Sequence, residues 1–151
     1  MKVIDNPLFH PTSDINITPE ILLCIRAWWA KFNSFTLEQK SRIKNGLSFY
    51  LNGLSGTEMT RFSNLYLFLD SIYGVNGNVE NSIKTALAKK LPDTSEDLIS
   101  DFWNLRCDIL HGGIDRVHRW KDFLKFLKTH STDPTSCLNH LCNKIICNNI
   151  Y

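Results

Sequence analysis

The apolar residues of this chain recur at intervals of three and four, and this helical period constrains the fold more than any other feature. Capping or turn-forming residues interrupt the pattern roughly every fifteen to twenty residues, and no segment alternates as a strand does. The pattern predicts helices over about 18–33, 37–51, 79–90, 95–111 and 114–130, a further one that Ser55 or Thr57 opens and that runs to residue 73, and a last one from Pro134. We therefore predict an all-α bundle of about six to seven helices.

The length of the chain and its charge narrow the classes of protein to consider. A chain of 151 residues argues for one domain, which we place at residues 18–151 after an irregular arm at residues 1–17. The net charge of +2 neither requires nor excludes a nucleic-acid partner. No apolar run approaches the roughly 18 residues of a membrane span, and the first residues lack a signal peptide's apolar core. We expect a cytoplasmic protein with no membrane partner.

The cysteines could in principle form disulfides or bind a metal ion. There are five of them, and an odd number without an export signal predicts free thiols. The residues that invite a zinc interpretation are Cys137, His140, Cys142 and Cys147. Their spacing lacks a paired C-x2-C knuckle, so we expect cysteines that serve as small apolar residues in a helix. We predict no metal and no cofactor.

One stretch of the sequence contains candidate catalytic residues. It reads Phe-Trp-Asn-Leu-Arg-Cys-Asp-Ile-Leu-His-Gly-Gly over residues 102–113, so that Arg106 precedes His111 by five residues near the end of a predicted helix. The stretch resembles the HEPN family, which consists of small helical bundles with an R-x4-6-H motif often written R-N-D-I-V-H-G. The resemblance is sharp over about a dozen residues and extends loosely to residues 61–73, which look like the long helix that precedes the motif.

The resemblance implies a HEPN-like helical bundle that acts as a dimeric, metal-independent endoribonuclease. It also points to a toxin or phage-defence effector with an antitoxin or regulatory partner. The family commonly has a polar residue where this chain has Cys107. Toxins paired with a nucleotidyltransferase antitoxin carry a tyrosine where this chain has Gly113, so the Gly-Gly ending is more similar to the Apea-like variety.

The residue types suit RNA cleavage. Histidine titrates near neutrality, so His111 can move the proton of the ribose 2′-hydroxyl. Arginine stays charged, so Arg106 can hold the phosphate oxygens as negative charge develops. Asp108 lies one helical turn before His111 and would orient it or pair with Arg106. The expected products carry 2′,3′-cyclic phosphate ends.

The helix of residues 95–111 is apolar on two adjacent stripes. One stripe is the natural core face and consists of Leu98, Phe102, Leu105 and Ile109. Arg106 and His111 are about 140° apart and flank the second stripe, so a two-fold contact would gather both pairs around one cleft. We predict a homodimer with an interface of Ile99, Trp103, Cys107 and Leu110. The plainer interpretation is the most buried helix of a bundle, with Arg106 extending to solvent.

Three further residues, Arg116, Arg119 and Lys121, make the next segment basic and could contact the RNA backbone. A solvated helix face explains them equally well. The second hypothesis for function is a catalytically inactive HEPN-like domain that binds RNA or a protein partner, and Cys107 favours it. A third is a helical adaptor in which the motif arose by chance.

Overall fold

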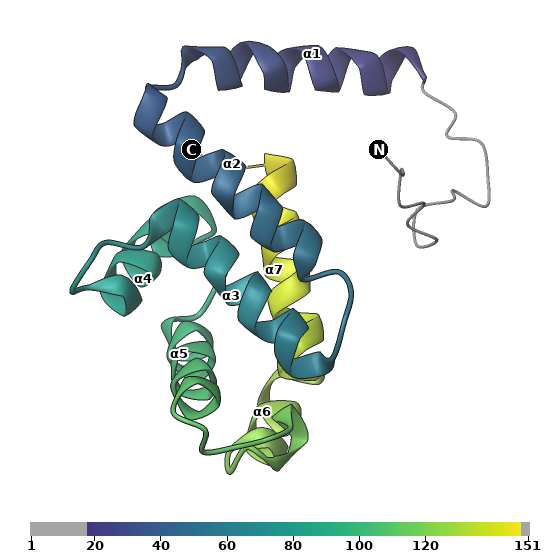
Figure 1. Cartoon of the computed structure of the whole chain (residues 1–151). Coiled ribbons are helices and arrows are strands. Elements are labelled where there is room, and N and C mark those ends of the chain that lie inside the picture. The colour runs from purple at the N-terminus through teal and green to yellow at the C-terminus, as the bar shows by residue number, and fades with distance from the viewer. Residues whose placement is uncertain (1–17, 149–151) are drawn as a thin grey trace, which may run out of the picture. The chain divides into compact units, whose positions relative to one another are not determined.

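The structure is a computed structural model that describes residues 18–148, so the predicted arm at residues 1–17 lies outside the described residues. The described part contains seven α-helices, one short 3-10 helix and no strand, which confirms the all-α prediction. The helices are α1 (Pro19–Ser34), α2 (Leu37–Asn52), α3 (Glu58–Tyr73), α4 (Val79–Lys90), α5 (Glu96–Leu110), η2 (Val117–Arg119), α6 (Phe123–His130) and α7 (Pro134–Asn148) (Figure 1). Among these residues no helix is long and apolar enough to cross a membrane.

Internal contacts divide the chain into two units between Thr36 and Leu37, so α1 is described by itself. Its N-cap is Thr18, whose side-chain oxygen accepts a hydrogen bond from the backbone N–H of Ile21. Near its other end the rings of Trp28 and Trp29 stack on Phe32, with centroids 5.3 and 5.7 Å away. Capping and aromatic contacts along one side stabilise this helix locally.

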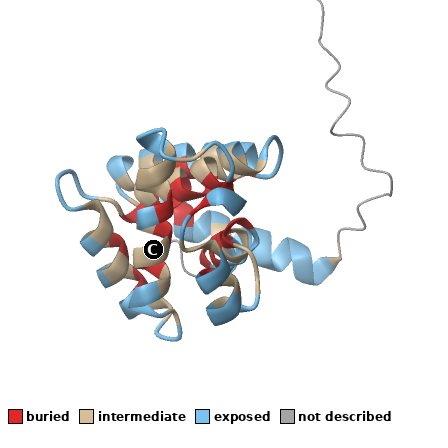
Figure 2. Cartoon of the chain, turned by 90° about the horizontal axis from the view of Figure 1, so that it is seen from below, coloured by how far each residue is buried: buried red, intermediate tan, exposed pale blue. Residues whose placement is uncertain are grey.

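Helix α3 is the central element of the second unit, because it contacts α2, α4, α5 and α7 (Figure 1). Its buried residues are Phe62, Leu65, Tyr66, Phe68, Leu69, Ile72 and Tyr73. Figure 2 shows the buried positions gathered on the inward sides of the helices. A Cβ at Gly46 of α2 would lie 2.7 Å from the Ile72 side chain, so glycine allows α2 to approach α3 closely.

The C-terminal end of α3 is held by an arginine from α2. Arg42 Nε donates to the carbonyl oxygen of Ser71 at 2.8 Å, and Nη2 donates to that of Gly74 at 2.5 Å. Ser71 Oγ donates in return to the carbonyl oxygen of Arg42 at 3.0 Å. A cation at this end of a helix satisfies carbonyls that have no partner within the helix and complements the dipole.

The predicted helix over residues 114–130 is wrong in its first half. Residues 117–119 form only the 3-10 turn η2, Trp120 adopts an extended backbone with ψ 131°, and α6 begins at Phe123. This break allows Val117, Trp120 and Phe126 to be buried together, at 0, 2 and 1% exposure. Leu124, which a continuous helix would place on the same side, is 78% exposed instead.

Candidate functional site

Helix α5 positions the motif residues. Ser95 caps its first turn by accepting a hydrogen bond from the backbone N–H of Leu98 at 3.1 Å. Its core face then packs into the bundle, where the ring of Phe102 lies 6.1 Å from that of Phe62 and 5.8 Å from that of Phe126. Anchored in this way to α3 and α6, the helix holds Arg106 and its C-cap residue His111 in a fixed place.

The end of α5 is a Schellman motif built on the glycines that follow His111. Gly112 has a φ of +69°, in the left-handed region. Its N–H donates to the Ile109 carbonyl at 3.2 Å, and the N–H of Gly113 donates to the Asp108 carbonyl at 2.8 Å. His111 is the C-cap residue and is exposed. The His-Gly pair of the motif therefore ends the helix and leaves the imidazole open to solvent.

We expect Gly112→Ala to lower the free energy of unfolding by about 1 kcal/mol. Nothing lies within 4 Å of a Cβ at this position, so the cost comes from the left-handed backbone rather than from a clash. Asparagine tolerates this conformation better, so Gly112→Asn is the matched control and should cost less. Urea unfolding of the two variants checks the prediction, and equal losses would contradict it.

Arg106 contacts aromatic rings rather than acceptors. Its guanidinium carbon lies 5.0 Å from the ring centroid of Trp103, on the same helix, and 5.6 Å from that of Tyr66 on α3. Within residues 18–148 the half-buried side chain of Arg106 makes no hydrogen bond and no ion pair. Its N–H donors are therefore uncommitted to protein acceptors and suit a phosphate, which accepts a bidentate pair of hydrogen bonds.

Tyr66 is the second aromatic residue beside Arg106, and the sequence analysis did not identify it as part of the site. The residue is 1% exposed, and its buried hydroxyl has no hydrogen-bond partner in the described residues. Burial raises the pKa of Tyr66 far above its usual range, and the Arg106 charge opposes this rise without cancelling it. The phenol therefore stays neutral, and its ring rather than a charge faces the arginine.

Asp108 is half-buried, and within the described residues it forms no ion pair with Arg106 or His111. The structure of one chain thus does not bring it to either predicted partner. Cys107, which stands where the resembled family has a polar residue, is also half-buried.

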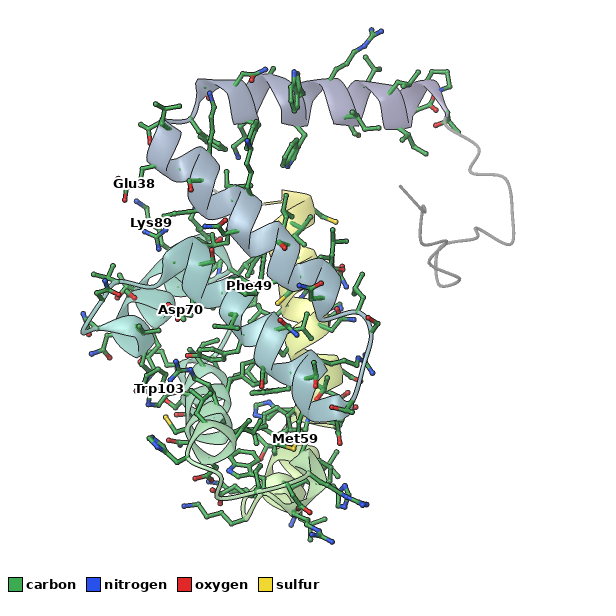
Figure 3. The ribbon with its side chains drawn as sticks, in the orientation of Figure 1. Glu38, Phe49, Met59, Asp70, Lys89 and Trp103 are labelled. Atoms are coloured by element: carbon green, nitrogen blue, oxygen red, sulfur yellow. The ribbon has the colours of Figure 1, made fainter. Side chains whose placement is uncertain are left out.

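The predicted dimer residues fall into two groups. Ile99 is 1% exposed, so its place in an interface is corrected: it belongs to the core of one chain. Trp103, which is labelled in Figure 3, is half-buried, and Cys107 is likewise half-buried. Leu110 is 60% exposed, which leaves a large apolar side chain on the surface beside the motif.

The predicted RNA-contacting residues Arg116, Arg119 and Lys121 are exposed, but they do not form one face of a helix. Arg119 donates two hydrogen bonds to the Asp115 carboxylate, at 2.9 and 2.8 Å. Arg116 lines a cleft of about 320 Å³ against the start of α3. The other residues of this cleft are Thr57, Glu58, Met59, Asp115 and His118. Arg119 is therefore paired with Asp115, whereas within the described residues neither Arg116 nor Lys121 forms an ion pair.

The cysteines form no disulfide within the described residues. All five cysteines are free thiols, and Cys142 is buried with its sulfur 3.6 Å from the Leu65 carbonyl oxygen. Residues 18–148 contain no group of three His, Cys, Asp or Glu side chains placed to hold a metal ion.

Comparisons with protein-family models, with curated proteins and with solved structures gave no match to this chain. The candidate site therefore rests on its own residues and geometry.

Proposed function

We propose that this chain is a HEPN-type endoribonuclease that works as a homodimer. One observation carries the proposal. Arg106 and the exposed His111 sit at the end of a core-anchored helix, and Arg106 keeps its N–H donors unpaired within the described residues. A half-buried arginine side chain without an acceptor can bind an anion, and the histidine at the end of the same helix can serve as a general acid or base.

The proposed reaction is transesterification within the RNA strand. His111 takes the proton of a ribose 2′-hydroxyl, and the 2′-oxygen attacks the adjacent phosphorus. The bond from phosphorus to the 5′-oxygen breaks, and the leaving oxygen takes a proton from the protonated His111 of the partner subunit. The products are a 2′,3′-cyclic phosphate and a 5′-hydroxyl. Arg106 stabilises the negative charge that builds on the phosphate oxygens.

The proposal is tested with the purified chain and a set of unrelated RNAs. Cleavage should persist in excess EDTA, and mass spectrometry should find cyclic phosphate at the new 3′ ends. A matched substrate with a single 2′-deoxyribose at the preferred site should resist cutting there, because it lacks the nucleophile. Intact RNA throughout, or cleavage that ignores the 2′-deoxy substitution, would overturn the proposed function.

A catalytically inactive domain that binds RNA or a protein partner is the second candidate. The observation that favours it is that the motif residues also have structural contacts: Gly112 ends α5, and Arg106 packs on two aromatic rings. Under this alternative the chain retards RNA in a gel without cutting it, or does neither. The cleavage assay therefore separates the two candidates.

The dimer is tested through Leu110. We expect sedimentation to show a wild-type dimer at roughly tens of micromolar, because an interface of standard size should hold there. Leu110→Asp should weaken association at least about tenfold, since it places a charge in the expected apolar contact. Leu124→Asp is the matched control, because that leucine is 78% exposed and lies outside the motif helix. A wild-type monomer, or equal effects of the two changes, would contradict the expected interface.

A further inference from the structure

We propose that Trp103 and Tyr66 are positioning residues that hold the Arg106 guanidinium for the scissile phosphate. The inference rests on the proposed function and extends its site by two residues from two helices. Trp103 lies one turn before Arg106 on α5, and Tyr66 reaches the same guanidinium from α3. Their role is to fix the place of the arginine without using its hydrogen-bond donors.

The two rings are themselves well fixed. Tyr66 is 1% exposed, and its ring stacks on that of Phe62 with centroids 6.5 Å apart. The rings of Tyr66 and Trp103 lie 6.3 Å apart at 51° to one another, so they form two walls rather than one flat surface. A guanidinium carbon within about 6 Å of both centroids is in the range of cation–π attraction. The core of the bundle thus extends directly to the arginine.

Aromatic rings are better partners for the Arg106 guanidinium than a carboxylate would be, because they leave its N–H donors free. An aspartate or glutamate would also hold an arginine, but it would occupy the N–H edge that a phosphate needs. A ring attracts the cation through its face and leaves that edge free. An arginine side chain also has many rotamers. Contacts that restrict these rotamers before binding lower the entropy cost of ordering the side chain when substrate binds. The arrangement therefore combines restraint with an open binding edge.

The first test measures cleavage by Trp103→Leu and Tyr66→Leu, which remove one ring each. We expect kcat to fall roughly tenfold in each, the scale of a partly desolvated cation–π contact, with KM little changed. The pH profile of kcat should keep its shape, because His111 is untouched. Tyr66→Phe is the matched control and should retain the wild-type rate, because the ring remains and the lost hydroxyl has no partner.

Urea unfolding of each variant separates positioning from folding. Should Tyr66→Leu not fold, the half-buried Trp103 decides the question, with Trp103→Phe expected to recover most of the rate lost in Trp103→Leu. Folded leucine variants that cut as fast as wild type would overturn the proposal. So would a Tyr66→Phe variant that loses as much activity as Tyr66→Leu.

A second test needs no activity. Aromatic ring currents should shift the Nε–H proton of the Arg106 guanidinium upfield in the NMR spectrum of the wild-type chain, since the guanidinium carbon lies over both rings, 5.0 Å from one centroid and 5.6 Å from the other. The shift should shrink in Trp103→Leu and persist in Tyr66→Phe. Unshifted wild-type signals would overturn the positioning role. Shifted signals in a chain that cuts no RNA would instead overturn the proposed function and leave the arginine contacts standing.

Discussion

Replacing His111 by alanine is expected to lower the rate of RNA cleavage roughly a hundredfold or more, the usual contribution of a positioned general acid or base. Arg106→Ala should lose at least as much, because the guanidinium stabilises charge that develops in the transition state. His111 is exposed at the helix end, and Arg106 is half-buried outside the core stripe of α5. Both variants should therefore fold, and circular dichroism with urea unfolding checks that they do.

Two controls make the rates interpretable. His140→Ala removes another exposed histidine, on α7, and should leave the rate unchanged. Arg106→Lys keeps the charge but loses the planar fork, so it should recover only part of the activity lost in Arg106→Ala. Folded alanine variants that cut as fast as wild type would rule out these residues as catalytic. A loss in His140→Ala of the same size would show that the assay reports general damage.

The sequence predicted the ends of a helix well where the capping contacts are made by residues close in sequence. Ser95 accepts a hydrogen bond from a backbone N–H three residues later, and Gly112 takes a left-handed backbone at the other end of the same helix. Such caps depend on neighbouring residues only, so sequence spacing reveals them. The same spacing failed after residue 113, because the break at Trp120 is set by burial of its ring beside Phe126, 6.2 Å away.

Contacts between distant segments could not be predicted from the pattern. The apolar period of α1 resembles that of the other helices, yet the internal contacts separate it from residues 37–148. Tyr66 lies in the predicted helix over residues 57–73, and helical spacing alone cannot show that its ring faces Arg106, forty residues later. Ile99 was assigned to a dimer surface because it continues an apolar stripe, whereas α3 and α4 already pack on that helix. Periodicity identifies an apolar face but not what covers it.

The largest loss of stability is expected from Phe102→Ala. Phe102 has no exposed surface, and its ring lies between those of Phe62 on α3 and Phe126 on α6, so it joins three helices. Removing a buried phenylalanine ring leaves a cavity and typically costs about 3–5 kcal/mol, a large part of the stability of an ordinary domain. We expect urea unfolding to show a loss of this size, with cleavage falling only as far as the folded fraction falls.

Leu124→Ala is the control for this prediction, because a leucine that is 78% exposed has little packing to lose. Its unfolding free energy should stay within about 0.5 kcal/mol of wild type. Phe102→Leu should lie between the two, since it keeps part of the buried volume and leaves a smaller cavity. If Phe102→Ala were no more destabilising than Leu124→Ala, then α5 would not be anchored by this ring. The fixed placement of Arg106 and His111 would then need another cause.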